Sequence, residues 1–197
     1  MALGKQAKIL SKAQQEAVLA YLAKTRNPIR NRAIFLLSVK AGLRAKEIAC
    51  LTWAMVTDAE GRLADAISLT DAASKGRRGG RTIPLNKELK TALVALIAEE
   101  ATATRSSPFV IATERSPKTS SYAVVNMFAG WYRELGFYGA SSHSGRRTAI
   151  TAWARRISSV GGSLRDVQLL AGHSALGTTQ RYIEASEEAK RRVVEML

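Results

Sequence analysis

Apolar residues recur at helical spacing through most of this chain. Ser11 and Gln14 form the pattern of a capping box, and the apolar residues that follow predict a first helix. A second, strongly apolar helix is predicted to begin near Pro28, which suits a first-turn position, and to run to Val39. Gly42 then ends it. The N-terminal part therefore predicts two consecutive helices.

The next part predicts a third helix and then a change to strands. The pattern over residues 44–53 indicates a helix with Arg44 at or near its first turn. Short apolar runs at residues 63–69 and 81–85 flank the basic, glycine-rich segment 74–80. This arrangement predicts a β-hairpin with a positively charged tip.

The remainder of the chain again predicts helices. These segments are, in order, a helix over residues 87–102 capped by Asn86, a loop over 106–117, a helix over 120–135, and helical runs from Ser142 onward with turns at 161–162 and 172–177. The expected fold class is mainly α with one small antiparallel β-sheet (α+β). Because 197 residues suffice for one substantial core, we expect a single domain over residues 1–197.

Charge and cysteine content narrow the function classes. Lysine and arginine total 30 against 16 acidic residues, a formal charge of +14, which suits a polyanionic partner but also fits an inert basic surface. The single cysteine, Cys50, lies in an apolar stretch, is expected to fill the core, and fits a reducing compartment. No signal-peptide pattern and no apolar run of about 18 residues is present, so we expect a cytoplasmic protein without membrane contact.

Three segments carry groups suited to phosphate chemistry. In the first, A-G-L-R-A-K-E, Arg44 follows a glycine turn and Glu47 lies one helical turn later, where it is placed to hold the guanidinium rigidly. A surface ion pair explains this spacing equally simply. In the second, His143 and Arg146 have the H-x-x-R spacing that puts an imidazole and a guanidinium on one helix face. Such a pair can move a proton and bind two phosphate oxygens, while a structural histidine is the alternative.

The third segment runs from Gly172 through His173 to Tyr182. A glycine-bounded turn separates imidazole from phenol, and Thr178 is expected to cap the helix that carries Tyr182. A free phenol has a pKa near 10, so it acts as a nucleophile at neutral pH only beside cationic neighbours. Taken alone, Tyr182 fits an ordinary core or edge position.

In order and spacing, the three segments resemble the tyrosine recombinase (phage integrase) family. The matching motifs are A-G-L-R-x-x-E, H-x-x-R and G-H-x-x-x-x-T-x-x-x-Y, and both histidines of the chain fall on family positions. The resemblance covers roughly residues 9–187 and implies the DNA breaking-rejoining catalytic fold of that family.

The resemblance also implies a mechanism for site-specific recombination. Arg44 and Arg146 would clamp the scissile phosphate and stabilise its transition state. His143 would accept the phenolic proton or hold the phosphate, and His173 would hydrogen-bond a phosphate oxygen. Tyr182 would attack phosphorus to form a 3′-phosphotyrosine and free a 5′-hydroxyl. Because that link keeps the phosphoester energy, no metal, ATP or other cofactor is expected.

The basic hairpin supplies further candidates. Family members use a hairpin lysine as general acid toward the leaving 5′-oxygen, and Lys75 is the lysine of this tip. A solvated turn that touches phosphates loosely is the alternative for Lys75. Arg77, Arg78, Arg81 and Arg147 are expected to contact DNA.

The resemblance extends to partners, with two departures. The expected partner is double-stranded DNA with inverted-repeat recombination sites, bound by a homotetramer with possible accessory DNA-bending proteins. Gly145 stands where many members carry an apolar residue, which would loosen the helix start. We expect no separate N-terminal core-binding domain, as in short inversion-type recombinases. The amphipathic segment 186–197 is expected to dock either on a neighbouring subunit or on its own core.

Three other functions compete with recombination. A type IB topoisomerase shares the arginines, lysine and tyrosine, although it usually lacks a counterpart of His143. A non-catalytic DNA-binding protein that keeps the fold would tolerate loss of the six catalytic candidates. A metal-dependent nuclease is disfavoured because the sequence offers no carboxylate cluster suited to two metal ions.

Overall fold

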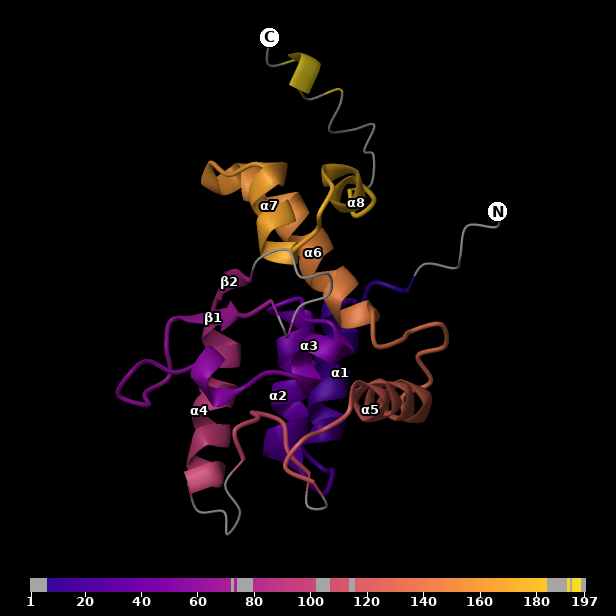
Figure 1. The fold of residues 1–197 in the computed structure, drawn as a ribbon. Helices are drawn as coiled ribbons and strands as arrows, with labels where there is room; N and C mark the ends of the chain where they lie inside the picture. The colour runs from indigo at the N-terminus through magenta and orange to yellow at the C-terminus, as the bar shows by residue number, and fades with distance from the viewer. Residues whose placement is uncertain are drawn as a thin grey trace. The chain divides into compact units, whose positions relative to one another are not determined.

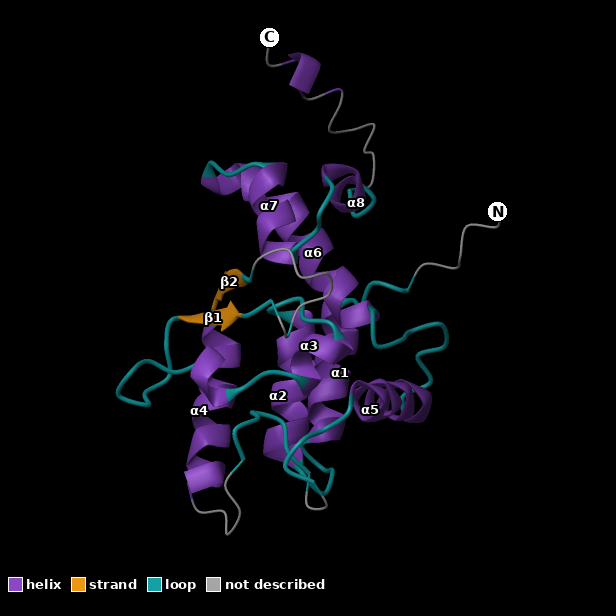
Figure 2. Cartoon of the chain, viewed as in Figure 1, coloured by secondary structure: helices purple, strands orange, loops and turns teal. Residues whose placement is uncertain are grey.

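The computed structural model describes residues 7–71, 73, 80–101, 107–113, 116–183, 191 and 193–195. The chain divides into two compact units, Met1–Ala149 and Ile150–Leu197. In the described residues helices predominate, with one two-stranded sheet (Figures 1 and 2). The fold class is therefore the mainly helical one that the sequence predicts.

The first unit holds most of the elements. In order, they are α1 (Lys12–Leu22), α2 (Pro28–Val39), α3 (Ala45–Ala49), the 3-10 turn η1 (Trp53–Met55), β1 (Ala66–Leu69), β2 (Arg81–Pro84), α4 (Lys87–Ala101), α5 (Ser121–Glu134) and the beginning of α6 (Ser144–Arg156). The second unit holds the rest of α6, the 3-10 turn η2 (Ile157–Val160), α7 (Leu164–Ala171) and α8 (Leu176–Gln180).

Several helices begin where their capping residues predict. The Ser11 hydroxyl accepts a hydrogen bond from the Gln14 N–H while the Gln14 side chain accepts one from the Ser11 N–H, so the capping box of α1 is confirmed. Pro28 occupies the first turn of α2. The Asn86 side chain accepts from the Glu88 N–H at the start of α4.

Helix α2 forms the centre of the first unit. It contacts α1, α3 and α4, and α5 covers α1 and α3 (Figure 1). Ile34, Phe35, Leu36 and Leu37 are all fully buried. Since consecutive residues point to every side of a helix, this burial shows that α2 is enclosed all round rather than packed on one face. Cys50 is half-buried and packs against this core, as predicted for a filler.

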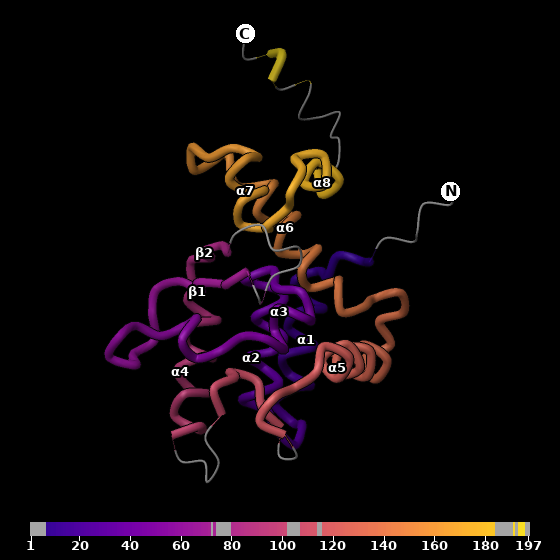
Figure 3. Tube along the Cα trace, viewed as in Figure 1, coloured from indigo at the N-terminus to yellow at the C-terminus, as the bar shows by residue number. Residues whose placement is uncertain are grey.

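The predicted hairpin is present as β1 and β2. The two strands pair antiparallel, with Ile67 opposite Ile83 and Leu69 opposite Arg81. Both isoleucines are buried, which directs one face of the small sheet to the core. After two residues β2 leads into α4 (Figure 3). Most of the predicted basic tip, residues 74–79, lies outside the described residues.

The helix predicted over residues 44–53 is shorter in the structure. Helix α3 ends at Ala49 because the chain then pairs with a distant segment: the Val110 N–H donates to the Leu51 carbonyl at 2.9 Å. The Trp53 N–H donates to the Pro108 carbonyl at 3.0 Å. A tertiary pairing has therefore replaced the last helical turns that the local pattern favoured.

The second unit has a small core of its own. Ile150, Val167 and Ala171 are fully buried, and Tyr182 packs against them. Gly172 ends α7 with φ of +63°, a left-handed conformation in which glycine is favoured. No helix among the described residues is long and apolar enough to cross a membrane.

Candidate active site

Gly42 places Arg44 at the start of α3. Its φ of +63° lets the chain leave α2 sharply, and the Leu43 N–H then donates to the Leu37 carbonyl at 3.1 Å. Arg44 follows in an extended conformation as the residue that caps α3. The A-G-L-R sequence is thus a helix-ending glycine followed by an arginine at a fixed junction.

Glu47 gathers arginines from separate elements. Its Oε1 accepts from Arg44 Nη1 at 2.9 Å, and its Oε2 accepts from the Arg44 backbone N–H at 2.8 Å. Arg81 at the start of β2 donates Nη1 to Oε1 and Nη2 to Oε2, both at 2.9 Å. The Glu47 side chain is only 1% exposed. The pair of Arg44 and Glu47 is therefore a buried device, and the surface ion pair is wrong.

Arg146 joins the same group from α6. Its Nη1 donates to the Gly42 carbonyl at 2.6 Å and lies 3.9 Å from Glu47 Oε2. The residue is 3% exposed. The first and second motifs therefore meet at one carboxylate, although 102 positions separate Arg44 from Arg146 in the sequence.

The electrostatics of this cluster favour an anion. Three guanidinium groups, from Arg44, Arg81 and Arg146, face one carboxylate, which leaves a surplus of two positive charges. Burial alone would raise the pKa of the Glu47 carboxyl, but the hydrogen bonds and charge of Arg81, with contributions from Arg44 and Arg146, hold that pKa below its ordinary value. Glu47 is thus ionised at neutral pH and keeps its grip on the arginines.

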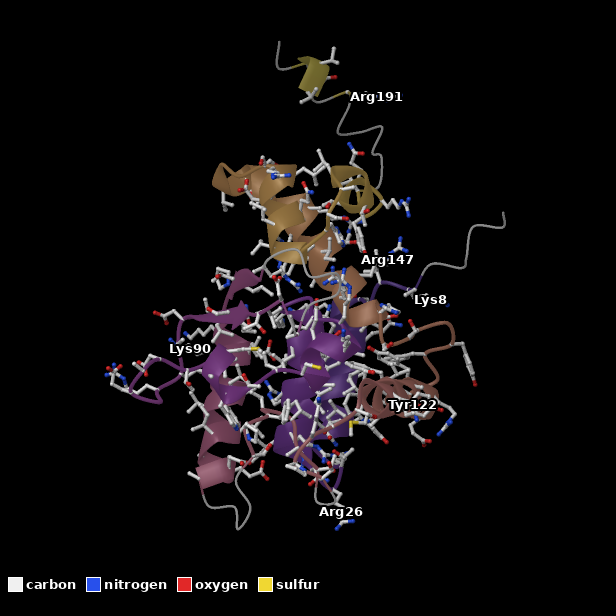
Figure 4. All side chains as sticks on the ribbon, viewed as in Figure 1. Lys8, Arg26, Lys90, Tyr122, Arg147 and Arg191 are labelled. Atoms are coloured by element: carbon white, nitrogen blue, oxygen red, sulfur yellow. The ribbon has the colours of Figure 1, made fainter. Side chains whose placement is uncertain are left out.

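His143 lies at the mouth of α6 and is exposed. Its carbonyl accepts from the Arg147 N–H at 2.9 Å, and its own N–H donates to the Ser141 hydroxyl at 3.3 Å. His143 therefore precedes the helix that carries Arg146, and the two are not both inside one helix as the spacing suggested. Arg147 (Figure 4) is half-buried, and within the described part of the chain its Nε has no hydrogen-bond partner.

Gly145 has a packing role that the sequence did not reveal. A Cβ at this position would lie 2.4 Å from Ser38 Oγ and 2.9 Å from Ser38 Cβ. Ser38 lies on α2 and is fully buried. The glycine therefore permits close contact between α6 and α2, and the expectation that it loosens the helix start is wrong.

In the second unit His173 and Tyr182 lie together. Their ring centroids are 5.4 Å apart with an interplanar angle of 24°. His173 Nδ1 is 2.9 Å from the hydroxyl of Thr179, which is fully buried, and the His173 carbonyl accepts from Gln168 Nε2 at 2.9 Å. The phenol and the imidazole are thus held side by side, with the imidazole fixed through its backbone and its ring.

Thr178 does not cap the helix near Tyr182. Helix α8 begins at Leu176, so Thr178 is inside it, and Tyr182 follows its end in a turn closed by a hydrogen bond from the Tyr182 N–H to the Thr179 carbonyl at 3.0 Å. The threonine that matters for the site is the next one, Thr179. Its link to His173 spans six positions and crosses the turn after α7.

The structure settles the surroundings of some predicted residues and not of others. Arg44 and Arg146 meet on Glu47 within the first unit, and His173 meets Tyr182 within the second. Lys75, Arg77 and Arg78 lie outside the described residues, as does most of the predicted docking segment 186–197. No group of three or more potential metal ligands occurs among the described residues.

Comparison with known proteins assigns the family. The sequence model of the phage integrase family matches residues 8–189. The chain belongs to the phage integrase family. It is 30% identical over 170 residues to tyrosine recombinase XerC of Bifidobacterium longum subsp. infantis (strain ATCC 15697 / DSM 20088 / JCM 1222 / NCTC 11817 / S12), a match that covers 83% of this chain and 46% of the relative. The chain thus spans about half the length of the curated relatives it matches.

Solved structures agree on the fold of this phage integrase family member. The Tn1549 transposon integrase in complex with transposon right end DNA has a TM-score of 0.75 at 20% identity, covering 100% of this chain and 68% of that one. XerA recombinase has a TM-score of 0.73 at 20% identity, covering 95% of this chain and 64% of that one. These matches support the breaking-rejoining fold that the motifs implied.

Proposed function

We propose that this chain is the catalytic part of a site-specific DNA recombinase that cuts and rejoins strands through a 3′-phosphotyrosine at Tyr182. The observation that carries the proposal is the buried Glu47 cluster, in which Arg44 and Arg146 are held together with surplus positive charge. A phosphodiester carries one negative charge, and its pentacoordinate transition state carries two. The surplus of two positive charges therefore favours the transition state over the ground state.

The remaining groups take the roles that the family motif gives them. The Tyr182 phenolic oxygen attacks phosphorus while the bond from phosphorus to the 5′-oxygen breaks. His143, exposed at the start of α6, accepts the phenolic proton or holds the phosphate. His173 donates a hydrogen bond to a phosphate oxygen. Lys75 gives a proton to the leaving 5′-oxygen. The reverse reaction rejoins the strand without metal or ATP, because the phosphotyrosine retains the phosphoester energy.

The proposed partner is double-stranded DNA, which the formal charge of +14 favours. The solved Tn1549 transposon integrase and XerH recombinase were each captured with a DNA substrate, which supports the same partner here. We further propose inverted-repeat sites, assembly of four copies on DNA and accessory DNA-bending proteins. Arg77, Arg78 and Arg147 are the proposed DNA contacts, and Arg147 supports this with a guanidinium nitrogen that no described residue occupies.

A nicked suicide duplex tests the function. A pool of such duplexes with a randomised core is incubated with the protein, and SDS-stable adducts are isolated and sequenced. We expect adducts on a defined site with inverted repeats, formed equally well in EDTA. Strict magnesium dependence would point instead to a metal-dependent nuclease, and relaxation of supercoiled DNA without site preference would point to a topoisomerase.

A further inference from the structure

The contacts of Arg81 differ from those expected of a DNA-binding arginine. Its side chain is 9% exposed, and both terminal nitrogens bind the two oxygens of Glu47 at 2.9 Å. Two parallel hydrogen bonds to a buried carboxylate fix rotation as well as distance, which a single charge contact cannot do. The earlier assignment of Arg81 to DNA contact therefore gives way to a structural link between β2 and α3.

The link is made at the base of the hairpin. Arg81 is the first residue of β2 and pairs with Leu69, the last residue of β1. The preceding residue, Gly80, lies so close to β1 that a Cβ there would be 2.1 Å from the Leu69 carbonyl oxygen. The two limbs of the hairpin are thus pressed together where Arg81 binds Glu47. A change at this base moves the whole segment that leaves from it.

Lys75 belongs to that segment. It stands midway in sequence between Leu69 and Arg81, six positions from each. The residue that supplies the leaving-group proton and the arginines that bind the phosphate come from different elements. They act on one phosphate only if the hairpin is kept in register with Glu47, and Arg81 is the described residue that joins the two.

We propose that Arg81 is a positioning residue of the recombination reaction, which anchors the hairpin to the Glu47 cluster so that Lys75 protonates the 5′-oxygen of the phosphate bound by Arg44 and Arg146. The proposal rests on the proposed function. In the step concerned, the bond from the Tyr182 oxygen to phosphorus forms, the bond from phosphorus to the 5′-oxygen breaks, and a proton passes from the Lys75 ammonium to that oxygen.

Arg81→Lys is the discriminating variant. Lysine keeps the positive charge beside Glu47, so the carboxylate stays neutralised, but it replaces two directional hydrogen bonds by one flexible contact. The hairpin is loosened while Arg44 and Arg146 keep their partner. If Arg81 served DNA through charge alone, this variant would behave as the wild type.

The leaving group separates positioning of Lys75 from other effects. The substrate is a nicked suicide duplex selected by the wild-type protein, prepared with either oxygen or sulfur at the 5′-bridging position. An alkoxide needs a proton to leave, whereas a thiol, with a pKa near 8.5, departs without general-acid help. We expect Arg81→Lys to lose about tenfold or more in the rate of adduct formation with oxygen and to regain most of that loss with sulfur. Lys75→Ala should show the same pattern.

A second variant perturbs the hairpin base without changing any charge. Gly80→Ala must push against the Leu69 carbonyl, so it should show the same loss with oxygen and recovery with sulfur. Gly130→Ala is the matched control, because a Cβ at Gly130 meets no atom within 4 Å, and its rates should equal those of the wild type. Unfolding midpoints identify any variant that fails to fold.

DNA affinity provides the opposing arm. We expect Kd for the same duplex, measured by fluorescence anisotropy across salt concentrations, to change less than twofold in Arg81→Lys with an unaltered salt slope. Wild-type rates with oxygen, a loss that persists with sulfur in both Arg81→Lys and Gly80→Ala, or a reduced salt slope would each overturn the positioning role. If the wild-type protein forms no adduct with either substrate, the proposed function itself fails.

Discussion

Replacing Glu47 by glutamine tests whether the arginine cluster is organised by one buried charge. The carboxylate is 1% exposed and accepts four hydrogen bonds, two from Arg44 and two from Arg81. Glutamine keeps the shape but removes the charge and turns one acceptor into a donor facing guanidinium groups. Removing one partner of a buried ion pair costs about 3–5 kcal/mol. Because glutamine retains one acceptor, we expect a loss in the free energy of unfolding near the lower bound, about 3 kcal/mol.

Urea unfolding at pH 7 measures this loss, and Glu88→Gln is the matched control. Glu88 also binds two cations, Arg32 at 3.0 Å and Lys40 at 3.1 Å, but its side chain is 35% exposed. Water screens that pair, so the same chemical change should cost under about 1 kcal/mol. Equal costs at the two positions would refute the reasoning that burial makes the Glu47 cluster rigid.

The pH dependence gives an independent check on Glu47. Its pKa is lowered in the folded protein, so the ionised carboxylate adds stability above its unfolded pKa, and that stability is lost as pH falls through the folded pKa. The wild-type advantage over Glu47→Gln should therefore be constant near neutrality and shrink in acid below the unfolded pKa. A difference that grows on acidification would contradict the assigned direction of the pKa shift.

Two further predictions concern packing around the catalytic groups. Gly145→Ala should cost about 1–3 kcal/mol in urea unfolding because its Cβ meets Ser38, and Ser38→Gly should recover part of the loss in the double variant; strict additivity of the two changes would refute direct contact. Thr179→Val, which removes the hydroxyl beside His173 Nδ1, should slow adduct formation and shift its pH profile, whereas Thr179→Ser should retain most of the wild-type rate; a valine variant as active as the serine variant would show that the hydroxyl does not position the ring.

The sequence predicts those features that local chemistry determines. Caps at Ser11 and Asn86, the turn at Gly42 and the pairing of β1 with β2 all follow from residues close together in the chain. The same locality explains the error at residues 44–53, where the helical pattern continues but pairing with residues 108–110 ends the helix.

Within the site, motif spacing identified the reactive groups but not the residues that hold them. The contact of Arg81 with Glu47 joins residues 34 positions apart, and no periodicity reports such a pair. Gly145 was interpreted from its lack of a side chain, whereas its meaning lies in Ser38 on another helix. Thr178 and Thr179 are both plausible partners in sequence, and only the turn after α7 decides that Thr179 faces His173.

Mapping the covalent adduct tests the central claim most directly. The wild-type protein is trapped on the selected suicide duplex and digested with nuclease and trypsin, and the peptide that carries the residual nucleotide is sequenced by mass spectrometry. We expect the modification on Tyr182 and no adduct with Tyr182→Phe, while Tyr138→Phe, which alters a tyrosine that is 82% exposed, retains the wild-type yield. An adduct on another residue, or one that persists in Tyr182→Phe, would contradict the proposed mechanism.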